Sequence, residues 1–333
     1  MGPTWEEVGN LQDPSLHSLG ENLKTHVLHS KEKSTVNKYT AAFRRWEAWA
    51  NRYPEITSLP AKPVHVAAYF SNLAKSGKFS AVESAFYGIS WAHNVANLPD
   101  PTDHALPRQT KEGLKRRLGK PVRTRLPIPY NFLVGFAEKA NSTKSLMDLR
   151  LATMCCVAYG GFLRYDDLAP LQVRDIYFGN GHIEVNIKKS KTDVYSEGDK
   201  VLVAASGKIT CPVGLLQQYY GKVGIVASTP PDTYVFRAIS GSGSKAKLRK
   251  INKPLSYSRA RELLKEALRK AGQDASLYGL HSLRIGGTSS AARAGIDHTL
   301  LKAHGRWKSE AAKDLYVRYS EAQRMEVSLA TGV

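Results

Sequence analysis

Cysteine is scarce in this chain of 333 residues, which contains only Cys155, Cys156 and Cys211. Three cysteines cannot build a regular disulfide framework, and none of them lies in a C-x-x-C pair of the kind that zinc sites use. Long hydrophobic runs are also missing: no segment approaches the roughly 18 apolar residues of a membrane span, and residues 1–7 lack the apolar core of a secretion signal. We therefore expect an intracellular protein in a reducing compartment, with no structural metal and no membrane partner.

Acidic residues are also scarce relative to basic ones. The chain has 29 Asp and Glu against 48 Lys and Arg, which gives a formal net charge of +19 at pH 7. Such an excess favours a polyanionic partner, because Lys and Arg neutralise phosphates and release counterions. Nucleic acid is the leading candidate, although some basic proteins have no such partner. The sequence also shows no carboxylate cluster that suggests magnesium.

The length exceeds what one hydrophobic core usually serves, so two domains are expected. Residues 1–33 are polar and aperiodic, and we predict a flexible N-terminal arm there. Residues 34–119 place apolar side chains such as Tyr39, Phe43 and Trp46 at helical spacing, which predicts a helical domain. Within it, helices are expected from Ser34 to Pro54 and at about 63–76, 80–98 and 108–119.

A cluster of cations precedes and enters residues 120–129, where Pro127 and Pro129 disfavour a helix. This pattern predicts a basic linker between the two domains, with a solvated helix face and a loop as the alternative. The candidate DNA-binding residues in this stretch are Lys115, Arg116, Arg117, Lys120, Arg123 and Arg125.

Residues 130–333 predict a second domain that is mainly α with a small antiparallel β-sheet. Helices are expected at about 130–141, 145–159, 212–221, 257–271, 281–294, 297–303 and 309–319. Strands are expected at 173–178, 182–188 and 200–203, with a short one at 234–237. Residues 241–253 are rich in Gly, Ser, Lys and Arg and predict a loop, whose basic tract 245–250 is either simply flexible or an aid to nuclear import.

Four short motifs follow one another in this domain, and each is weak when taken alone. In the first, Arg164 follows an apolar helix and precedes Asp167, with which a surface salt bridge is the ordinary expectation. In the second, the run 188–192 (Lys-Lys-Ser-Lys-Thr) falls where two strands would meet in a hairpin. A basic hairpin tip is usually just solvated.

The third motif places His281 and Arg284 three residues apart, so that both share one face at the start of a helix. The fourth is Trp307 in a Gly-Arg-Trp-Lys-Ser run, followed nine residues later by Tyr316. Taken singly, a Trp and a Tyr in such positions are more often part of a core.

All four motifs, in this order and at these spacings, resemble the tyrosine recombinase (phage integrase) family, whose catalytic set is Arg, Lys, His-x-x-Arg, His or Trp, and Tyr. The resemblance covers residues of about 150–320, whereas the N-terminal part is similar to the family's core-binding domain in layout only. It implies that Asp167 supports the site and that the catalytic residues are Arg164, Lys191, His281, Arg284, Trp307 and Tyr316.

The resemblance also implies how the protein works on its partner. The family's fold is a two-domain clamp around double-stranded DNA, with no cofactor and no metal. A dimer on one DNA site and a tetramer in synapsis are expected, with the tail after Tyr319 packing on a neighbour. DNA strands would be cleaved and rejoined through a 3′-phosphotyrosine intermediate without ATP.

The chemistry of these residues supports the same reaction independently of the family resemblance. An attacked phosphodiester gathers negative charge on its non-bridging oxygens, which Arg164 and Arg284 can hold by bidentate hydrogen bonds in place of a metal. A phenol has an unperturbed pKa of about 10, so Tyr316 needs nearby cations or a base such as His281. The departing 5′ oxygen needs a proton, which a hairpin lysine can donate. Trp307 can donate its indole N–H to the phosphate.

Several alternatives remain open at this point. Tyr319 competes with Tyr316 as nucleophile, and Lys188 and Lys189 compete with Lys191, because a register slip of one residue changes which side chain faces the site. His298 and His304 are expected on helix surfaces rather than as ligands.

Two other functions are also weighed. One is a type IB topoisomerase-like enzyme, which would relax DNA as a monomer. The other is a domesticated DNA-binding protein that has lost its activity. Residues 34–49 look like the eukaryotic transposon-borne branch of the family (DIRS-like or Crypton-like), which would imply a nuclear site of action.

Overall fold

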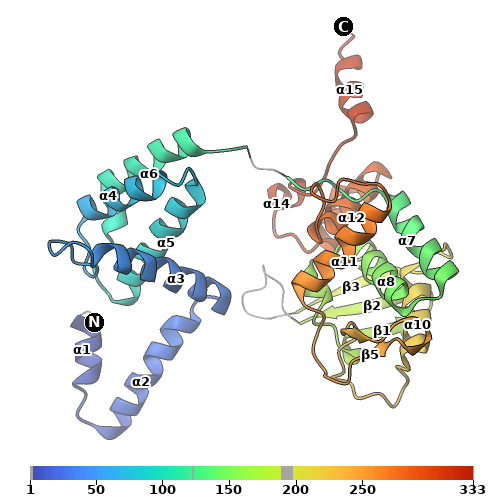
Figure 1. Cartoon of the computed structure of the whole chain (residues 1–333), viewed down its shortest axis with the longest axis horizontal. Helices are drawn as coiled ribbons and strands as arrows, with labels where there is room; N and C mark the ends of the chain where they lie inside the picture. Colours follow the sequence, from blue (N-terminus) through green and yellow to red (C-terminus); the bar gives the residue numbers. More distant parts are fainter. Residues whose placement is uncertain (1–2, 122–123, 189–197, 333) are drawn as a thin grey trace. The chain divides into compact units, whose positions relative to one another are not determined.

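The computed structural model describes residues 3–121, 124–188 and 198–332 (Figure 1). By its internal contacts the chain divides into two compact units, Met1–Val122 and Arg123–Val333. The division falls inside the segment 120–129. Among the described residues, no helix is both long enough and apolar enough to cross a membrane.

The N-terminal unit is built of helices around an aromatic core. Its elements are α1 (Pro3–Gly9), α2 (Pro14–His29), α3 (Lys33–Ala50), α4 (Pro63–Ala74), α5 (Phe79–Val95), the 3-10 helix η1 (Pro101–Asp103) and α6 (Ala105–Leu118). Trp46, Phe70 and Ile89 are completely buried between α3, α4 and α5. A Cβ atom on Gly88 would lie only 2.7 Å from the Cβ of Ala42, so glycine allows α5 to pack closely on α3.

Helices occupy residues 3–29, where the sequence analysis expects an irregular arm. Asp13 caps α2 by accepting hydrogen bonds from the backbone N–H groups of Ser15 and Leu16, and Pro14 occupies the first turn, where its missing N–H costs nothing. The indole N–H of Trp5 donates to the carbonyl of Val95 at 2.6 Å, which ties α1 to the end of α5. Pro14 therefore starts a helix here instead of breaking one.

The C-terminal unit has more elements and contains the sheet. Its elements are α7 (Tyr130–Thr143), α8 (Leu146–Gly160), α9 (Tyr165–Leu168), η2 (Val173–Asp175), β1 (Ile176–Gly179), β2 (His182–Ile187), β3 (Asp199–Ala204), α10 (Pro212–Val223), β4 (Ile239–Ser240), η3 (Gly243–Lys245), β5 (Lys247–Leu248), α11 (Tyr257–Lys270), α12 (His281–Arg293), α13 (His298–His304), α14 (Glu310–Asp314) and α15 (Glu321–Leu329). The prediction of a mainly α domain with a small antiparallel sheet is confirmed.

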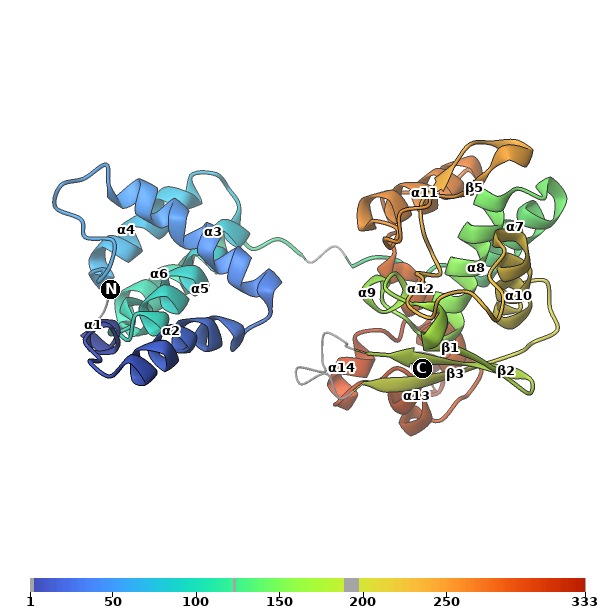
Figure 2. The ribbon, with the colours of Figure 1, turned by 90° about the horizontal axis from the view of Figure 1, so that it is seen from below.

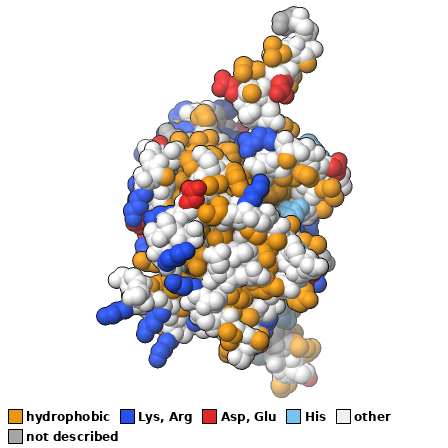
Figure 3. Space-filling model, turned by 90° about the vertical axis from the view of Figure 1, so that its right-hand side faces the viewer, with side chains coloured by type: hydrophobic (Ala, Val, Ile, Leu, Met, Phe, Trp, Pro, Cys, Tyr) orange, Lys and Arg blue, Asp and Glu red, His pale blue; other side chains and the backbone are white. Residues whose placement is uncertain are grey.

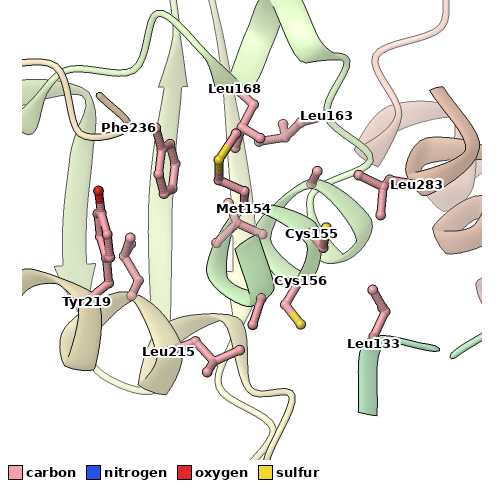
Figure 4. Close-up of a cluster of buried hydrophobic side chains, with 14 of the residues drawn as sticks. Leu133, Met154, Cys155, Cys156, Leu163, Leu168, Leu215, Tyr219, Phe236 and Leu283 are labelled. Carbon is pink, nitrogen blue, oxygen red and sulfur yellow. The ribbon is translucent and has the colours of Figure 1, made fainter. Parts of the chain in front are cut away.

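Helix α8 runs through the middle of the C-terminal core. Figure 4 shows Met154, Cys155 and Cys156 of α8 among apolar side chains contributed by other elements, such as Leu133 and Leu283. Fully burying one such side chain contributes about 1.5–3 kcal/mol. All three cysteines are buried as free thiols, as expected for small apolar side chains in a core.

Two glycines bring α12 directly onto α8 and the segment before α7. A Cβ atom on Gly286 would lie 2.4 Å from the carbonyl oxygen of Ile128, and one on Gly287 would lie 2.1 Å from that of Tyr159. Neither position has room for a side chain. This close packing fixes the helix that carries His281 and Arg284.

The sheet has the order β1-β2-β3 with antiparallel pairing, and its three strands lie side by side (Figure 2). Ile176 pairs with Val185, which pairs with Val201. Together with Ile183 and Val203, these side chains form the face that is buried against the core.

Some sequence expectations differ from the structure in detail. Residues 173–175 form the 3-10 helix η2 before β1 starts, because the Asp175 carboxylate accepts the backbone N–H of Gln172 at 2.9 Å. Residues 234–237 make only isolated bridges to Gln172 and Pro254. The expected loop 241–253 contains β5, which pairs with β4. The expected helix 309–319 ends at Asp314, and α15 follows after a break.

Candidate active site

Asp167 is buried and forms hydrogen bonds that hold the backbone of the first motif. It is 2% exposed, and its carboxylate accepts the backbone N–H of Arg164 at 2.9 Å. The same oxygen receives the Nη2 of Arg306 at 3.0 Å, and both side chains of this ion pair are almost fully buried. Asp167 thus pairs with Arg306, a residue 139 positions away, while its bond to Arg164 runs through the backbone. The Nη1 atom of Arg164 is buried and has no acceptor in the described part of the chain.

Arg284 comes from α12 and is completely buried. Its two terminal nitrogens donate to the carbonyl oxygens of Phe162 and Gly305. Phe162 has a φ of 46°, and Arg306, which follows Gly305, has a φ of 56°, so the turns that present these carbonyls adopt the left-handed conformation that is costly for residues other than glycine. Burial, and then the positive charges of Arg164 and Arg306, lower the pKa of Arg284. Three guanidiniums and one carboxylate therefore leave uncompensated positive charge in this region.

Four buried N–H groups at and around Arg284 have no hydrogen-bond acceptor among the described residues. They make up half of the eight buried polar side-chain atoms without a partner there, and they are Arg164 Nη1, Arg284 Nε, Arg306 Nε and Trp307 Nε1. The guanidinium carbon of Arg284 lies 4.4 Å from the centre of the Trp307 ring, and both Arg284 and Arg306 donate to the Phe162 carbonyl. An unsatisfied buried donor costs about 1–3 kcal/mol. Such a concentration is what an oxyanion-binding site has before its ligand arrives.

Tyr316 lies beside this group of donors. Its half-buried ring is 5.0 Å from that of Trp307 and 5.1 Å from that of His281, measured between centres, and the guanidinium carbon of Arg284 lies 4.9 Å away. Tyr319, by contrast, is 56% exposed. The structure therefore brings Tyr316 together with three of the other residues that the sequence singles out.

The backbone of Tyr316 is held on two sides. Its N–H donates to the carbonyl of Lys313 at 2.8 Å, and its carbonyl accepts the hydroxyl of the buried Ser289 at 3.1 Å. The same hydroxyl oxygen accepts the N–H of Arg318 at 3.0 Å. The two bonds to Ser289 of α12 take the place of helical bonds that are expected from the sequence through residue 319.

The candidate lysines are only partly covered by the structure. Lys189 and Lys191 lie outside the described residues. Lys188 forms an ion pair with Asp175 at 2.9 Å and donates to the side-chain oxygen of Gln172 at 2.8 Å. In this conformation Lys188 is bound at the edge of the sheet.

The histidines outside the third motif also have defined partners. His304 is half-buried rather than on the surface, and its Nε2 lies 2.8 Å from the carbonyl of Gly160, to which it donates. Burial lowers the pKa of His304, which favours the neutral ring. It packs edge-on against Phe162 and so supports the turn that contacts Arg284.

Residues 133–323, more than half of the sequence, match the model of the phage integrase family. The chain belongs to the phage integrase family. It is 26% identical over 315 residues to an integrase/recombinase XerD homolog of Selenomonas ruminantium, covering 93% of this chain and 89% of the relative. It is 23% identical over 296 residues to the recombinase Cre of Escherichia phage P1, covering 84% and 82%. The family resemblance found in the sequence is confirmed.

The fold is also similar to a solved structure. A XerH site-specific recombinase, solved with a palindromic difH substrate in a post-cleavage complex, aligns with a TM-score of 0.60 at 13% identity. The alignment covers 90% of this chain and 79% of that one. At this identity the likeness concerns the fold alone.

The candidate DNA contacts of this phage integrase family member belong to both units. Lys115, Arg116 and Arg117 form the exposed last turn of α6, and Lys120 is exposed beyond it. Arg123 lies outside the described residues. Arg125 donates to the carbonyl of Ser276 in the C-terminal unit.

Arg125 adjoins a group of cations that the sequence analysis missed. Arg261, Lys265 and Arg269 follow one another at intervals of four on α11 and so share one face. Partial burial, and then Arg261, Arg125 and Arg269, lower the pKa of Lys265. Elsewhere on this unit, on the side where α7 and α10 lie in Figure 1, Lys and Arg side chains also prevail over Asp and Glu (Figure 3). The spacing of four on α11 was the available signal for this surface.

Proposed function

We propose that this protein is a site-specific DNA recombinase, in which Tyr316 attacks a DNA phosphate and becomes joined to the 3′ end of the cleaved strand. The observation that carries this proposal is the set of four buried N–H donors without acceptors, directly beside a half-buried tyrosine. A phosphate would satisfy donors that are otherwise left unpaired.

The roles follow from the geometry of the donors. Arg164 and Arg284 bind the non-bridging oxygens, which carry more negative charge in the transition state, and the indole N–H of Trp307 adds a neutral donor. The pair of Asp167 and Arg306 holds the backbone turn that carries Arg164. Because these donors are already in place and shielded from water, little reorganisation is needed during the reaction.

The proton transfers complete the reaction. The phenol oxygen of Tyr316 forms a bond to phosphorus after losing its proton, for which His281 is the adjacent base. The 5′ oxygen leaves with a proton, and Lys191 is the proposed donor from its position in the sequence. The phosphotyrosine bond conserves the energy of the broken link, so that a 5′ hydroxyl of another strand can reverse the step without ATP.

Double-stranded DNA and further copies of the chain are the proposed partners. We expect the two units to hold DNA through α6, the linker and α11, and the protein to act as a dimer on one site and a tetramer in synapsis. Helix α15 extends from its unit (Figure 3) and exposes Met325, Val327 and Leu329, each more than half exposed. Its proposed acceptor on a neighbour is the groove of about 780 Å³ lined by β3 and α13. A monomeric topoisomerase would not need these exposed apolar side chains for contact between copies.

Assignment to a eukaryotic transposon-borne branch, and with it a nuclear site of action, stays a prediction from residues 34–49.

The test is a covalent trapping assay. Wild type, Tyr316→Phe and Tyr319→Phe are incubated with a nicked suicide substrate in buffer containing EDTA, then denatured and examined for a protein–DNA adduct. A DNA site is obtained by selection from random sequence. We expect an adduct with wild type and with Tyr319→Phe, and none with Tyr316→Phe. Absence of an adduct on DNA that the wild type binds would favour a domesticated binding protein.

A further inference from the structure

Lys313 is a buried lysine outside the group of phosphate donors. It lies on α14 and its side chain is only 1% exposed, although its sequence surroundings look like those of a surface helix. Its ammonium Nζ lies 2.8 Å from Nδ1 of His298, 2.6 Å from Oε2 of Glu310 and 3.4 Å from Oδ1 of Asp314. An ammonium has three hydrogens to donate, and here it has three acceptors.

These contacts define the state of the groups involved. Because an ammonium can only donate, Nδ1 of His298 accepts this hydrogen bond through its lone pair. The hydrogen bond that Lys313 donates to the Glu310 carboxylate raises the pKa of Lys313 above its usual value, which keeps the ammonium charged. His298, Glu310 and Asp314 also lie close enough together to suggest a cation site, but the ammonium of Lys313 already contacts all three.

The contacts of Lys313 connect α13 to the nucleophile. His298 is the first residue of α13, and the turn between α13 and α14 carries Trp307. A second ion pair, from Lys302 to Glu310 at 3.2 Å, spans the same two helices near the surface. At its other end, the carbonyl of Lys313 accepts the N–H of Tyr316 at 2.8 Å. A shift of α14 would therefore be transmitted directly to Tyr316.

We propose that Lys313 is a positioning residue for Tyr316: its buried ammonium fastens α14 to the start of α13 and so sets the distance between the tyrosine and the bound phosphate. This inference rests on the proposed recombinase function. Among the described residues the side chain of Lys313 contacts His298, Glu310 and Asp314, so the inference concerns the position of the nucleophile and not the binding of the phosphate. A displacement of a reacting group by about 1 Å can slow a reaction by roughly 100-fold.

The first experiment compares two lysine variants of the full-length chain. Lys313→Met keeps an unbranched side chain of similar length but removes the charge, and Lys302→Met makes the same change at the half-exposed ion pair of the same helices. With the suicide substrate, we expect Lys313→Met to slow formation of the Tyr316 adduct by about 10- to 100-fold. Lys302→Met should react at the wild-type rate, and all three proteins should bind DNA with the same Kd within about twofold.

A second pair of variants tests the acceptor, and remains usable if Lys313→Met does not fold. His298 is exposed, so its replacement leaves the core intact. Asn presents a side-chain oxygen near the place of Nδ1, whereas Leu presents none. We expect His298→Leu to slow adduct formation and His298→Asn to restore most of the rate. Equal rates for Leu and Asn would contradict a role for this hydrogen bond.

The deciding experiment separates the nucleophile from the phosphate site. In Tyr316→Phe, hydrogen peroxide is supplied as an external nucleophile that attacks phosphorus and releases the 5′ hydroxyl. If Lys313 acts only on the position of Tyr316, adding Lys313→Met to Tyr316→Phe leaves the peroxide-dependent cleavage unchanged. A parallel loss of this cleavage would overturn the proposal, because Lys313 would then support the phosphate site as a whole. A wild-type rate for Lys313→Met in the first experiment would overturn it as well, whereas failure of the wild type to form any adduct would sink the recombinase function itself.

Discussion

The two units differ in how many polar side chains they bury and in how completely these are hydrogen-bonded. In the N-terminal unit the buried polar side chains are His93 and Thr102, among the residues that the structure describes. His93 is fully satisfied: its Nε2 accepts the N–H of Ala61 at 2.9 Å and its Nδ1 donates to the carbonyl of Ile89 at 2.8 Å. Of the eight buried polar atoms without a partner, His65 Nδ1 is the one from this unit. Its core is optimised for packing.

The C-terminal unit buries charge and leaves part of it unpaired. Its buried charged residues are Arg150, Asp167, Asp175, Arg284, Arg306 and Lys313. Unsatisfied polar groups destabilise a fold, and a concentration of them marks a region selected for another purpose. We therefore expect the N-terminal unit to depend mainly on apolar packing, and the unpaired buried groups of the C-terminal unit to serve the reaction. Four changes would test this difference, beginning with the largest expected effect.

Arg284→Ala should reduce the rate of adduct formation by about 1000-fold or more, because it removes a preorganised positive charge from the phosphate site. Single-turnover cleavage of the suicide substrate measures this rate. The matched control is Arg293→Ala in the exposed last turn of the same helix, which should retain the wild-type rate. A comparable loss in both variants would mean that α12 as a whole has been disturbed.

Trp46→Ala should lower the free energy of unfolding of the N-terminal unit by about 3–5 kcal/mol, through the cavity left by a fully buried indole. Its N–H also loses the hydrogen bond to the carbonyl of Ser58. Denaturant unfolding followed by a probe in each unit checks this. Tyr53→Ala, at a residue that is 42% exposed, is the control with a small expected effect. If the C-terminal transition shifted equally, the units would not be energetically separate.

Gly287→Ala should destabilise the C-terminal unit by about 1–3 kcal/mol, because the new Cβ would collide with the backbone of Tyr159. Gly135→Ala in α7 is the matched control, since nothing lies within 4 Å of the added atom. There the substitution should stabilise by about 0.5–1 kcal/mol, since alanine is the better helix former. Thermal unfolding of both variants measures the change in stability, which must have opposite signs in the two variants.

The smallest expected effect concerns pH and the N-terminal unit. Burial lowers the pKa of His93, so the folded state favours the neutral ring while the unfolded chain titrates near the usual value of about 6.5. Stability from this residue is therefore complete above that pH and is lost as the pH falls below it, by at most about 1.4 kcal/mol per pH unit. Denaturant unfolding between pH 7 and 5 measures the slope. His93→Gln should flatten it, and an unchanged slope would refute the assignment.

Motif spacing predicted the central part of the site because its residues lie close in sequence. His281 and Arg284 share one turn of α12, and Trp307 and Tyr316 flank the short helix α14. Arg306 could not be found in this way, since its partner Asp167 is 139 residues distant and an arginine beside Trp307 looks like a surface residue. Helix periodicity likewise gives no sign that Lys313 is buried, because that depends on how α13 meets α14.

The break after Asp314 was missed for a related reason. Residues 309–319 have helical propensity throughout, but the hydroxyl of Ser289 provides hydrogen-bond partners for Tyr316 and Arg318 that compete with a continued helix. The partner is on another element and 27 residues away along the sequence. Local propensity cannot reveal a bond of this kind.

The glycine pair of α12 limits where motion can occur during a reaction cycle. With the backbones of Gly286 and Gly287 against those of Ile128 and Tyr159, α12 cannot slide or rotate without a steric clash. His281 and Arg284 therefore stay fixed relative to α8, and a phosphate bound there as proposed would be held in a stationary frame. Tyr316 is attached to that frame only through hydrogen bonds and ring contacts. If a resting and a cleaving protomer differ in the position of Tyr316, we expect the movement in residues 309–320, because Gly305 and Arg306 are bonded to the arginine side of the site.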